Sequence, residues 1–168
     1  GLSASGKTTL CQGLHARLKS YVPELVVLDG EGVRTAFGDD LGYAEADRVQ
    51  QVKRLQAIAK LLADQNLIVV VAVLYAHPEL LEWNRKNLPG YVEIYLEASL
   101  ETVATRDIKG LYEAAQQGRT PNVVGIDIPW HAPVSPDLHI SVDGDLSPAE
   151  IVDQVVRSVP RFAELMQR

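Results

Sequence analysis

The chain of 168 residues is long enough for one domain. A domain of this size buries about 70% of the surface that its unfolded chain exposes, so no metal or disulfide is needed to stabilise it. Its 22 acidic and 16 basic side chains give a net charge of −6, which argues against nucleic acid or an anionic membrane as the main partner. No apolar run reaches the ~18 residues of a membrane-spanning helix, and the single cysteine, Cys11, is predicted to be a buried apolar side chain in a cytoplasmic protein.

The first nine residues, GLSASGKTT, carry the motif G-x-x-x-x-G-K-[ST]. In such a loop the backbone N–H groups surround a di- or triphosphate, because glycine tolerates conformations and close approaches that other side chains prevent. We expect Lys7 to reach the β- and γ-phosphates of ATP and the Thr8 hydroxyl to hold Mg²⁺. We expect a buried strand upstream of Gly1, since this loop follows a strand. The predicted ATP-binding residues of the loop are Gly1, Ser3, Ala4, Ser5, Gly6, Lys7, Thr8 and Thr9.

Strands and helices alternate along the rest of the chain. Apolar runs predict strands over residues 24–29, 67–74, 91–96 and 138–142. Helical periodicity and capping residues predict helices over residues 7–20, 45–65, 78–87, 99–106, 109–117 and 147–158, and again from residue 161. The alternation predicts an α/β fold with a doubly wound parallel sheet and helices on both faces.

Three other segments are predicted to be less regular. A single helical turn and a loop are expected to follow Asp29, and residues 119–137 are expected to form an extended loop because they are rich in proline. The helix predicted over residues 109–117 is charged and flanked by glycine, which suits a mobile lid.

Six motifs, in the same order, resemble the adenylyl-sulfate kinase family along nearly the whole chain. They are GLSASGKTTL, DGEGVR (29–34), DLGYAEADR (40–48), NLIVVVAVL (66–74), RDIKGLY (106–112) and VVGIDIPWHAP (123–133). The resemblance implies a three-layer P-loop kinase fold with a lid, formed as a single domain over residues 1–168. It also implies transfer of the γ-phosphoryl group of ATP, with Mg²⁺, to the ribose 3′-hydroxyl of adenylyl sulfate, and a protein that forms a homodimer.

Asp29 ends a predicted strand, at the edge where open α/β sheets bind ligands. We expect it to orient or deprotonate the acceptor hydroxyl and to hold Mg²⁺ through water, with Lys7 as the other catalytic residue. The alternative role for Asp29 is an N-cap of the helical turn that follows. Glu31 stands where the family has a second Asp, so the charge is kept on a longer side chain.

The resemblance also assigns the residues that surround the nucleotides. Arg34 and Arg48 match two arginines around the anionic end of the acceptor, where a planar guanidinium donates paired hydrogen bonds; the alternative for each is a solvated surface arginine. Tyr43 takes the place of an aromatic residue that stacks on the acceptor base, and Arg106 is expected over the donor ATP. The remaining predicted acceptor contacts are Asp29, Glu31, Gln51, Leu74, Tyr75, Lys109, Asn122 and Val123, with residues 125–127 supporting the last two.

The chain departs from the family mainly on the acceptor side. Gly32 and Gln51 each replace an Asn, and the family pattern F-I-S-P-[FY]-R is VLYAHP here (73–78), so a stacking Phe is lost and Tyr75 replaces the serine. Losing an aromatic stack costs roughly 1–3 kcal/mol per base, enough to change the preferred nucleotide. Arg85 could restore a positive charge or be a solvated helix residue.

Three functions therefore stay open at this point. The first is phosphorylation of adenylyl sulfate, and the second is the same chemistry on another nucleotide-linked acceptor such as cytidine diphosphoramidate. The third is a nucleotide-binding regulatory protein without turnover, which the presence of Lys7 and Asp29 disfavours.

Overall fold

Four short strands form the centre of the fold in the computed structural model, which describes residues 1–166. β1 (Leu25–Asp29) pairs in parallel with β2 (Ile68–Ala72), and β3 (Ile94–Glu97) pairs in parallel with β4 (Leu138–Ser141). All four predicted strands are therefore present, each somewhat shorter than its apolar run. Within the described residues they form two separate two-stranded sheets, where a single sheet was predicted: neither β1 nor β2 is hydrogen-bonded to β3 or β4.

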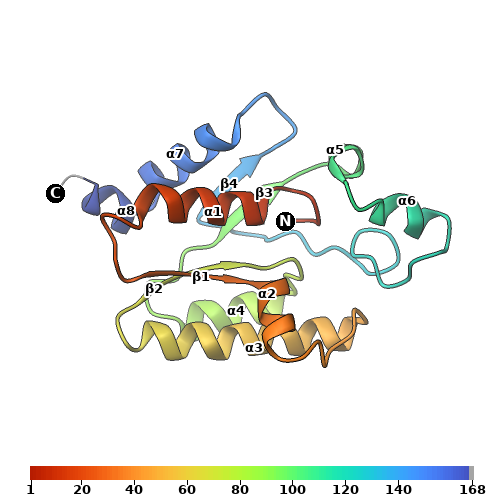
Figure 1. Cartoon of the computed structure of the whole chain (residues 1–168), viewed down its shortest axis with the longest axis horizontal. Coiled ribbons are helices and arrows are strands. Elements are labelled where there is room, and N and C mark those ends of the chain that lie inside the picture. Colours follow the sequence, from red (N-terminus) through yellow and green to blue (C-terminus); the bar gives the residue numbers. More distant parts are fainter. Residues whose placement is uncertain (167–168) are drawn as a thin grey trace.

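Helices cover the strands from both sides, as the α/β prediction requires (Figure 1). α1 (Lys7–Leu18) packs on β1, β2 and α7 (Pro148–Ser158), and its leucines at four-residue spacing are buried. On the other side α3 (Glu45–Ala63) packs on β2 and on α4 (Pro78–Asn87). This layering leaves the N-terminal end of α1 beside the carboxyl end of β1.

Two of the short helices differ from their predictions. α2 (Gly30–Ala36) has seven residues where a single turn was predicted, because Asp29 caps its N-terminus and the helix packs on β1 and α3. α6 (Leu111–Gln116) begins after Lys109, since Gly110 adopts a left-handed conformation (φ 64°) that interrupts the helix. Lys109 therefore lies in a loop.

The other helix boundaries agree with the capping signals. Ser99 accepts a hydrogen bond from the Thr102 N–H at the start of α5 (Leu100–Arg106), and Ser147 forms a capping box with Glu150 at the start of α7. α8 (Pro160–Leu165) follows α7 and packs on it.

The core lies between α1, α7 and the strands and includes Leu14, Leu18, Val103 and Val155. Cys11 is buried, which confirms the prediction, and burial raises the pKa of its thiol to about 11. Across residues 1–166, no helix has both the length and the apolar character needed to cross a membrane.

Candidate active site

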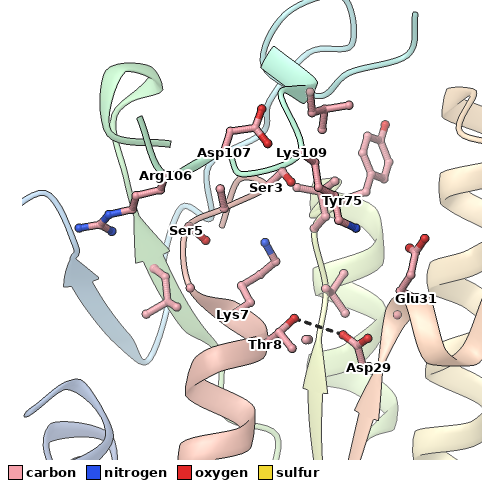
Figure 2. Close-up of a pocket in the computed structure, with 18 of the residues that line it drawn as sticks. Ser3, Ser5, Lys7, Thr8, Asp29, Glu31, Tyr75, Arg106, Asp107 and Lys109 are labelled. Atoms are coloured by element: carbon pink, nitrogen blue, oxygen red, sulfur yellow. Dashed lines mark hydrogen bonds between the residues drawn. The ribbon is translucent and has the colours of Figure 1, made fainter. Parts of the chain in front are cut away.

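A cavity of about 1250 Å³ opens between the phosphate loop (residues 1–8), the carboxyl ends of β1 and β2, and the loop that leads into α6 (Figure 2). Of the predicted site residues only Gly1 is outside its lining; a Cβ at Gly1 would meet the Leu96 carbonyl and the Ser5 hydroxyl. The predicted residues that line the cavity are Ser3, Ala4, Ser5, Gly6, Lys7, Thr8, Thr9, Asp29, Glu31, Arg34, Tyr43, Arg48, Gln51, Leu74, Tyr75, Arg106, Lys109, Asn122 and Val123.

The phosphate loop has the backbone conformation of an anion-binding nest. Ala4 and Gly6 adopt left-handed conformations, with φ angles of 60° and 94°, so that the backbone curls around the N-terminus of α1. Gly6 is the N-cap of that helix, and among residues 1–166 no side chain caps its first N–H groups. These donors and the helix dipole are therefore available to a phosphate.

Lys7 points into the cavity from the first turn of α1 (Figure 2), and its ammonium group donates a hydrogen bond to the Leu2 carbonyl of its own loop. Burial lowers the pKa of Lys7 to about 8, because the charged form loses water and the neighbouring charge of Asp29 restores only part of that loss. A polyphosphate in the cavity would supply the missing negative charge.

Asp29 faces the phosphate loop across the cavity (Figure 2). Its Oδ1 accepts a hydrogen bond from the Thr8 hydroxyl at 3.4 Å, and its Oδ2 accepts from the Gly32 N–H at 3.4 Å as the N-cap of α2. The two roles considered from the sequence are therefore compatible: the cap fixes the carboxylate at the strand end, where it also meets Thr8.

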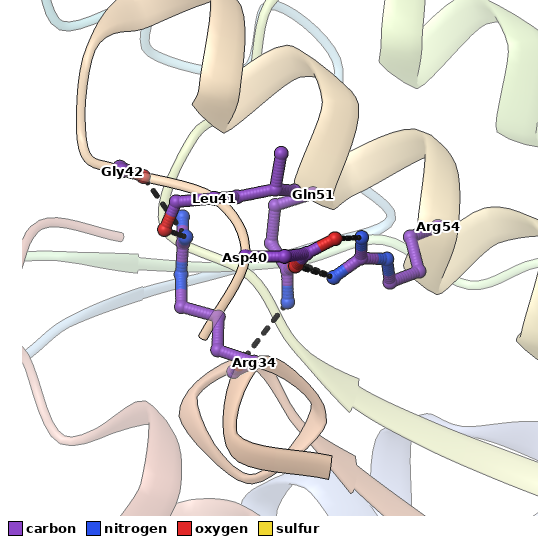
Figure 3. Close-up of polar contacts among 7 residues, drawn as sticks. Arg34, Asp40, Leu41, Gly42, Gln51 and Arg54 are labelled. Carbon is purple, nitrogen blue, oxygen red and sulfur yellow. Dashed lines mark hydrogen bonds and ion pairs between the residues drawn. The ribbon is translucent and has the colours of Figure 1, made fainter. Parts of the chain in front are cut away.

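The two predicted acceptor arginines are held by backbone carbonyls. Arg34 is 6% exposed and its Nη1 donates to Leu41 and Gly42 at 3.0 and 2.9 Å (Figure 3). Arg48 donates from Nε to the Tyr43 carbonyl at 2.9 Å and from Nη2 to the Asn122 carbonyl at 2.6 Å. Neither is a solvated surface arginine, and burial lowers the pKa of Arg48 from its ordinary value.

Gln51 and Tyr75, which also line the acceptor side of the cavity, are each held by a hydrogen bond. The Gln51 amide donates to the Gly30 carbonyl at 2.9 Å, so it fixes the start of α2. Tyr75 is 3% exposed, and its hydroxyl donates to the Glu45 carboxylate. Burial and this contact raise the pKa of Tyr75 to about 12, so the phenol stays protonated.

Arg85 does not line the cavity, so it does not restore a charge there. Its guanidinium donates to the Asp137 carboxylate at 3.2 Å and to the Ser135 carbonyl at 2.7 Å, and it lies 3.6 Å from the buried Glu93 carboxylate. These partners tie α4 to the chain segment before β4, and they draw the arginine away from the cavity.

The loop and helix at the lid contain contacts that the sequence did not reveal. Tyr112 on α6 is 1% exposed, and its hydroxyl donates to the Ser3 carbonyl of the phosphate loop at 3.1 Å. Its N–H donates to the Asp107 carboxylate at 2.8 Å. The tyrosine lies in the motif RDIKGLY (106–112), which is the signal that could have identified it. The expected mobile lid is thus attached to the phosphate loop in this structure.

Three more of the predicted residues, Arg106, Asn122 and Val123, make polar backbone contacts. Arg106 donates to the Val142 carbonyl at 2.8 Å, beyond the end of β4. The Asp127 carboxylate accepts from the N–H groups of Asn122 and Val123, which also lowers the pKa of Asp127. Asp127, one of the residues predicted to support Asn122 and Val123, thus holds their backbone N–H groups.

Comparisons with known proteins agree on one family. Residues 1–141 match the family model described as adenylylsulphate kinase. The adenylyl-sulfate kinase of Vibrio parahaemolyticus is 38% identical over 155 residues, which are 91% of this chain and 75% of that protein. That of Picosynechococcus sp. is 34% identical over 165 residues, 98% of this chain and 91% of that protein. The structure of the Mycobacterium tuberculosis APS kinase CysC in complex with AMPPNP and APS superposes with a TM-score of 0.84 at 30% identity, covering 100% of this chain and 94% of that one.

Proposed function

The chain belongs to the adenylyl-sulfate kinase family, and from this premise we propose that it transfers the γ-phosphoryl group of ATP to the ribose 3′-hydroxyl of adenylyl sulfate, giving 3′-phosphoadenylyl sulfate and ADP. The observation that carries the proposal is the layout of one cavity. A phosphate loop lies at one side, Asp29 faces it, and the buried Arg34 and Arg48 line the acceptor side.

Phosphoryl transfer needs charge neutralisation and in-line placement more than covalent help from the protein. The N–H groups of the phosphate loop and the N-terminus of α1 would hold the phosphates of ATP. Lys7, which now donates to the Leu2 carbonyl, would turn to the β- and γ-phosphates and neutralise the charge that develops there. Asp29 would orient the acceptor hydroxyl and take its proton as the phosphoryl group is transferred.

Mg²⁺ fits the residues present between the loop and β1. The Thr8 hydroxyl and the Asp29 carboxylate lie 3.4 Å apart and supply oxygen ligands, which Mg²⁺ prefers in proteins. Thr8 would bind the cation directly and Asp29 through water. When bound, the cation would neutralise charge on the β- and γ-phosphate oxygens.

Arg34 and Arg48 would hold the anionic end of the acceptor. Each guanidinium has five N–H donors, and the contacts with Leu41, Gly42, Tyr43 and Asn122 use only some of them. The remaining donors suit a sulfate group, because the guanidinium plane can donate paired hydrogen bonds to two of its oxygens.

One observation favours a second candidate, the same chemistry on a different nucleotide-linked acceptor such as cytidine diphosphoramidate. Val73 lines the cavity where the family has a stacking Phe, and the Tyr75 hydroxyl is bound to Glu45. The acceptor base therefore meets fewer aromatic faces than the family pattern provides.

A panel of acceptors in one coupled assay for ADP release tests the proposal. With ATP and Mg²⁺, we expect adenylyl sulfate to give the highest kcat/KM, and ATP alone to give only slow release. Cytidine diphosphoramidate and unsulfated AMP serve as matched comparisons. Faster turnover of the cytidine compound would move the assignment to the second candidate, and no acceptor-dependent release at all would favour a regulatory protein.

The proposal extends to the setting of the reaction. We place it in the cytoplasm, where ATP is supplied, and we expect the homodimer that the family resemblance implies. Sedimentation of the purified chain would measure that assembly.

A further inference from the structure

Glu31 and Tyr43, which are 12 positions apart in the sequence, are in contact at the acceptor side of the cavity. Glu31 stands where the family has a shorter Asp, and Tyr43 carries a hydroxyl that a Phe in its place would lack. In the structure the Tyr43 hydroxyl donates to Glu31 Oε1 at 2.9 Å. The longer side chain and the added hydroxyl are thus the two ends of one hydrogen bond.

Tyr43 needs such an anchor because its segment is otherwise irregular. It lies between α2 and α3, in a stretch where Gly38 and Asp39 both have positive φ angles, and the residue is 49% exposed. A ring in such a loop is free to turn away from the cavity unless side chains hold it.

Three contacts fix the ring from different directions. Arg34 holds the two preceding carbonyls and places its guanidinium carbon 4.8 Å from the ring centre. Arg48 donates to the Tyr43 carbonyl, with its guanidinium carbon 5.6 Å from the ring centre. The contact with Glu31 is the one that reaches the far end of the ring, so it sets the direction in which the ring points.

Glu31 also connects the ring to the reacting groups. It lies in the first turn of α2, two residues after Asp29, which caps that helix. The hydrogen bond that the Tyr43 hydroxyl donates to Glu31 also raises the pKa of Tyr43, which keeps the phenol protonated as a donor.

We propose that Glu31 is a positioning residue, whose carboxylate oxygen holds the Tyr43 ring as a platform for the acceptor base at a fixed place relative to Asp29. The inference rests on the proposed function, because it names the part of the same cavity that selects the acceptor. This positioning role depends on the length of the Glu31 side chain as well as on its charge. A carboxylate that acted through charge alone would not depend on side-chain length.

Two substitutions at one position separate length from charge. Glu31→Asp keeps the charge but withdraws the oxygen by one methylene, whereas Glu31→Gln keeps the length and an accepting oxygen but loses the charge. We expect Glu31→Asp and Tyr43→Phe each to raise the acceptor KM by about three- to tenfold, with a smaller effect on kcat, and Glu31→Gln to raise it clearly less than Glu31→Asp. The double variant Glu31→Asp with Tyr43→Phe should be no worse than the worse single variant.

The opposite order, with Glu31→Gln more impaired than Glu31→Asp, would overturn the proposal, and so would additive effects in the double variant. KM is measured with whichever acceptor of the panel turns over best, so the native preference tests the proposed function while the variants test the pair. A readout without turnover is the NMR titration of tyrosine labelled with ¹³C at Cζ, assigned with Tyr43→Phe. The Tyr43 pKa should fall in Glu31→Asp, and an unchanged pKa would contradict the contact.

Discussion

Asp29→Asn is expected to lower kcat with the preferred acceptor by about 10²- to 10⁴-fold, the range that removing a general base covers. The amide cannot take the proton of the acceptor hydroxyl. Asn is also a good N-cap, so α2 should keep its start and the loss should be chemical rather than structural. Steady-state kinetics and calorimetric binding of a non-hydrolysable ATP analogue measure the two effects separately.

The affinity for the ATP analogue should change far less than kcat, because the phosphate loop supplies most of the phosphate contacts. Asp153→Asn is the matched control: Asp153 lies on α7, half exposed, 3.7 Å from Arg17 and outside the cavity. A kcat within about twofold of the native value in Asp29→Asn, or a loss that appears only in ATP binding, would remove Asp29 from the role proposed for it.

Lys7→Met is expected to lower kcat/KM for ATP by about 10³-fold, since it removes a charge directed at the transferred group while keeping a side chain of similar length. Lys60→Met is the control, because Lys60 is partly exposed on α3, outside the cavity, and pairs with Asp64, a contact of little energetic value. Near-native turnover by Lys7→Met would show that the loop does not act on the γ-phosphoryl group.

The protonation state of Lys7 can be measured as well, by comparing proton uptake on triphosphate binding in the native protein and in Lys7→Met. Burial lowers the pKa of Lys7 to about 8, so at pH 8.5 much of the protein without nucleotide carries a neutral amine. A bound triphosphate raises that pKa by opposite charge, so binding should take up protons from solution at this pH. Calorimetry in buffers of different ionisation enthalpy should detect this proton uptake when the native protein binds the triphosphate. The protons that Lys7 takes up should be missing when Lys7→Met binds it.

The position of the phosphate loop and Asp29 could be predicted because both depend on local signals. The motif requires glycines at fixed spacing, and a buried parallel strand ends at a known edge of its sheet. The length of α2 could not be predicted from its residues, since Gly30 and Gly32 are weak helix formers. Its N-cap and its packing on β1 and α3 supply what the local sequence lacks.

Contacts between distant segments were the part that could not be predicted. Tyr112 and Ser3 are 109 residues apart, and Arg85 and Asp137 are 52 apart. Periodicity shows which face of an element is apolar, but it does not show which carboxylate or carbonyl the fold brings beside a given side chain. Strand pairing has the same limit: the apolar runs identified four strands, but not their arrangement as two pairs.

The fate of the γ-phosphorus of ATP is the most direct test of the transfer itself. The native chain is incubated with Mg²⁺, adenylyl sulfate and ATP labelled in its γ-phosphoryl group, and the products are separated and assigned by ³¹P NMR. The account predicts the label in a monoester on the ribose 3′-oxygen, with the bond between sulfate and phosphate intact. Label found only in inorganic phosphate, or at any other position of the acceptor, would contradict it.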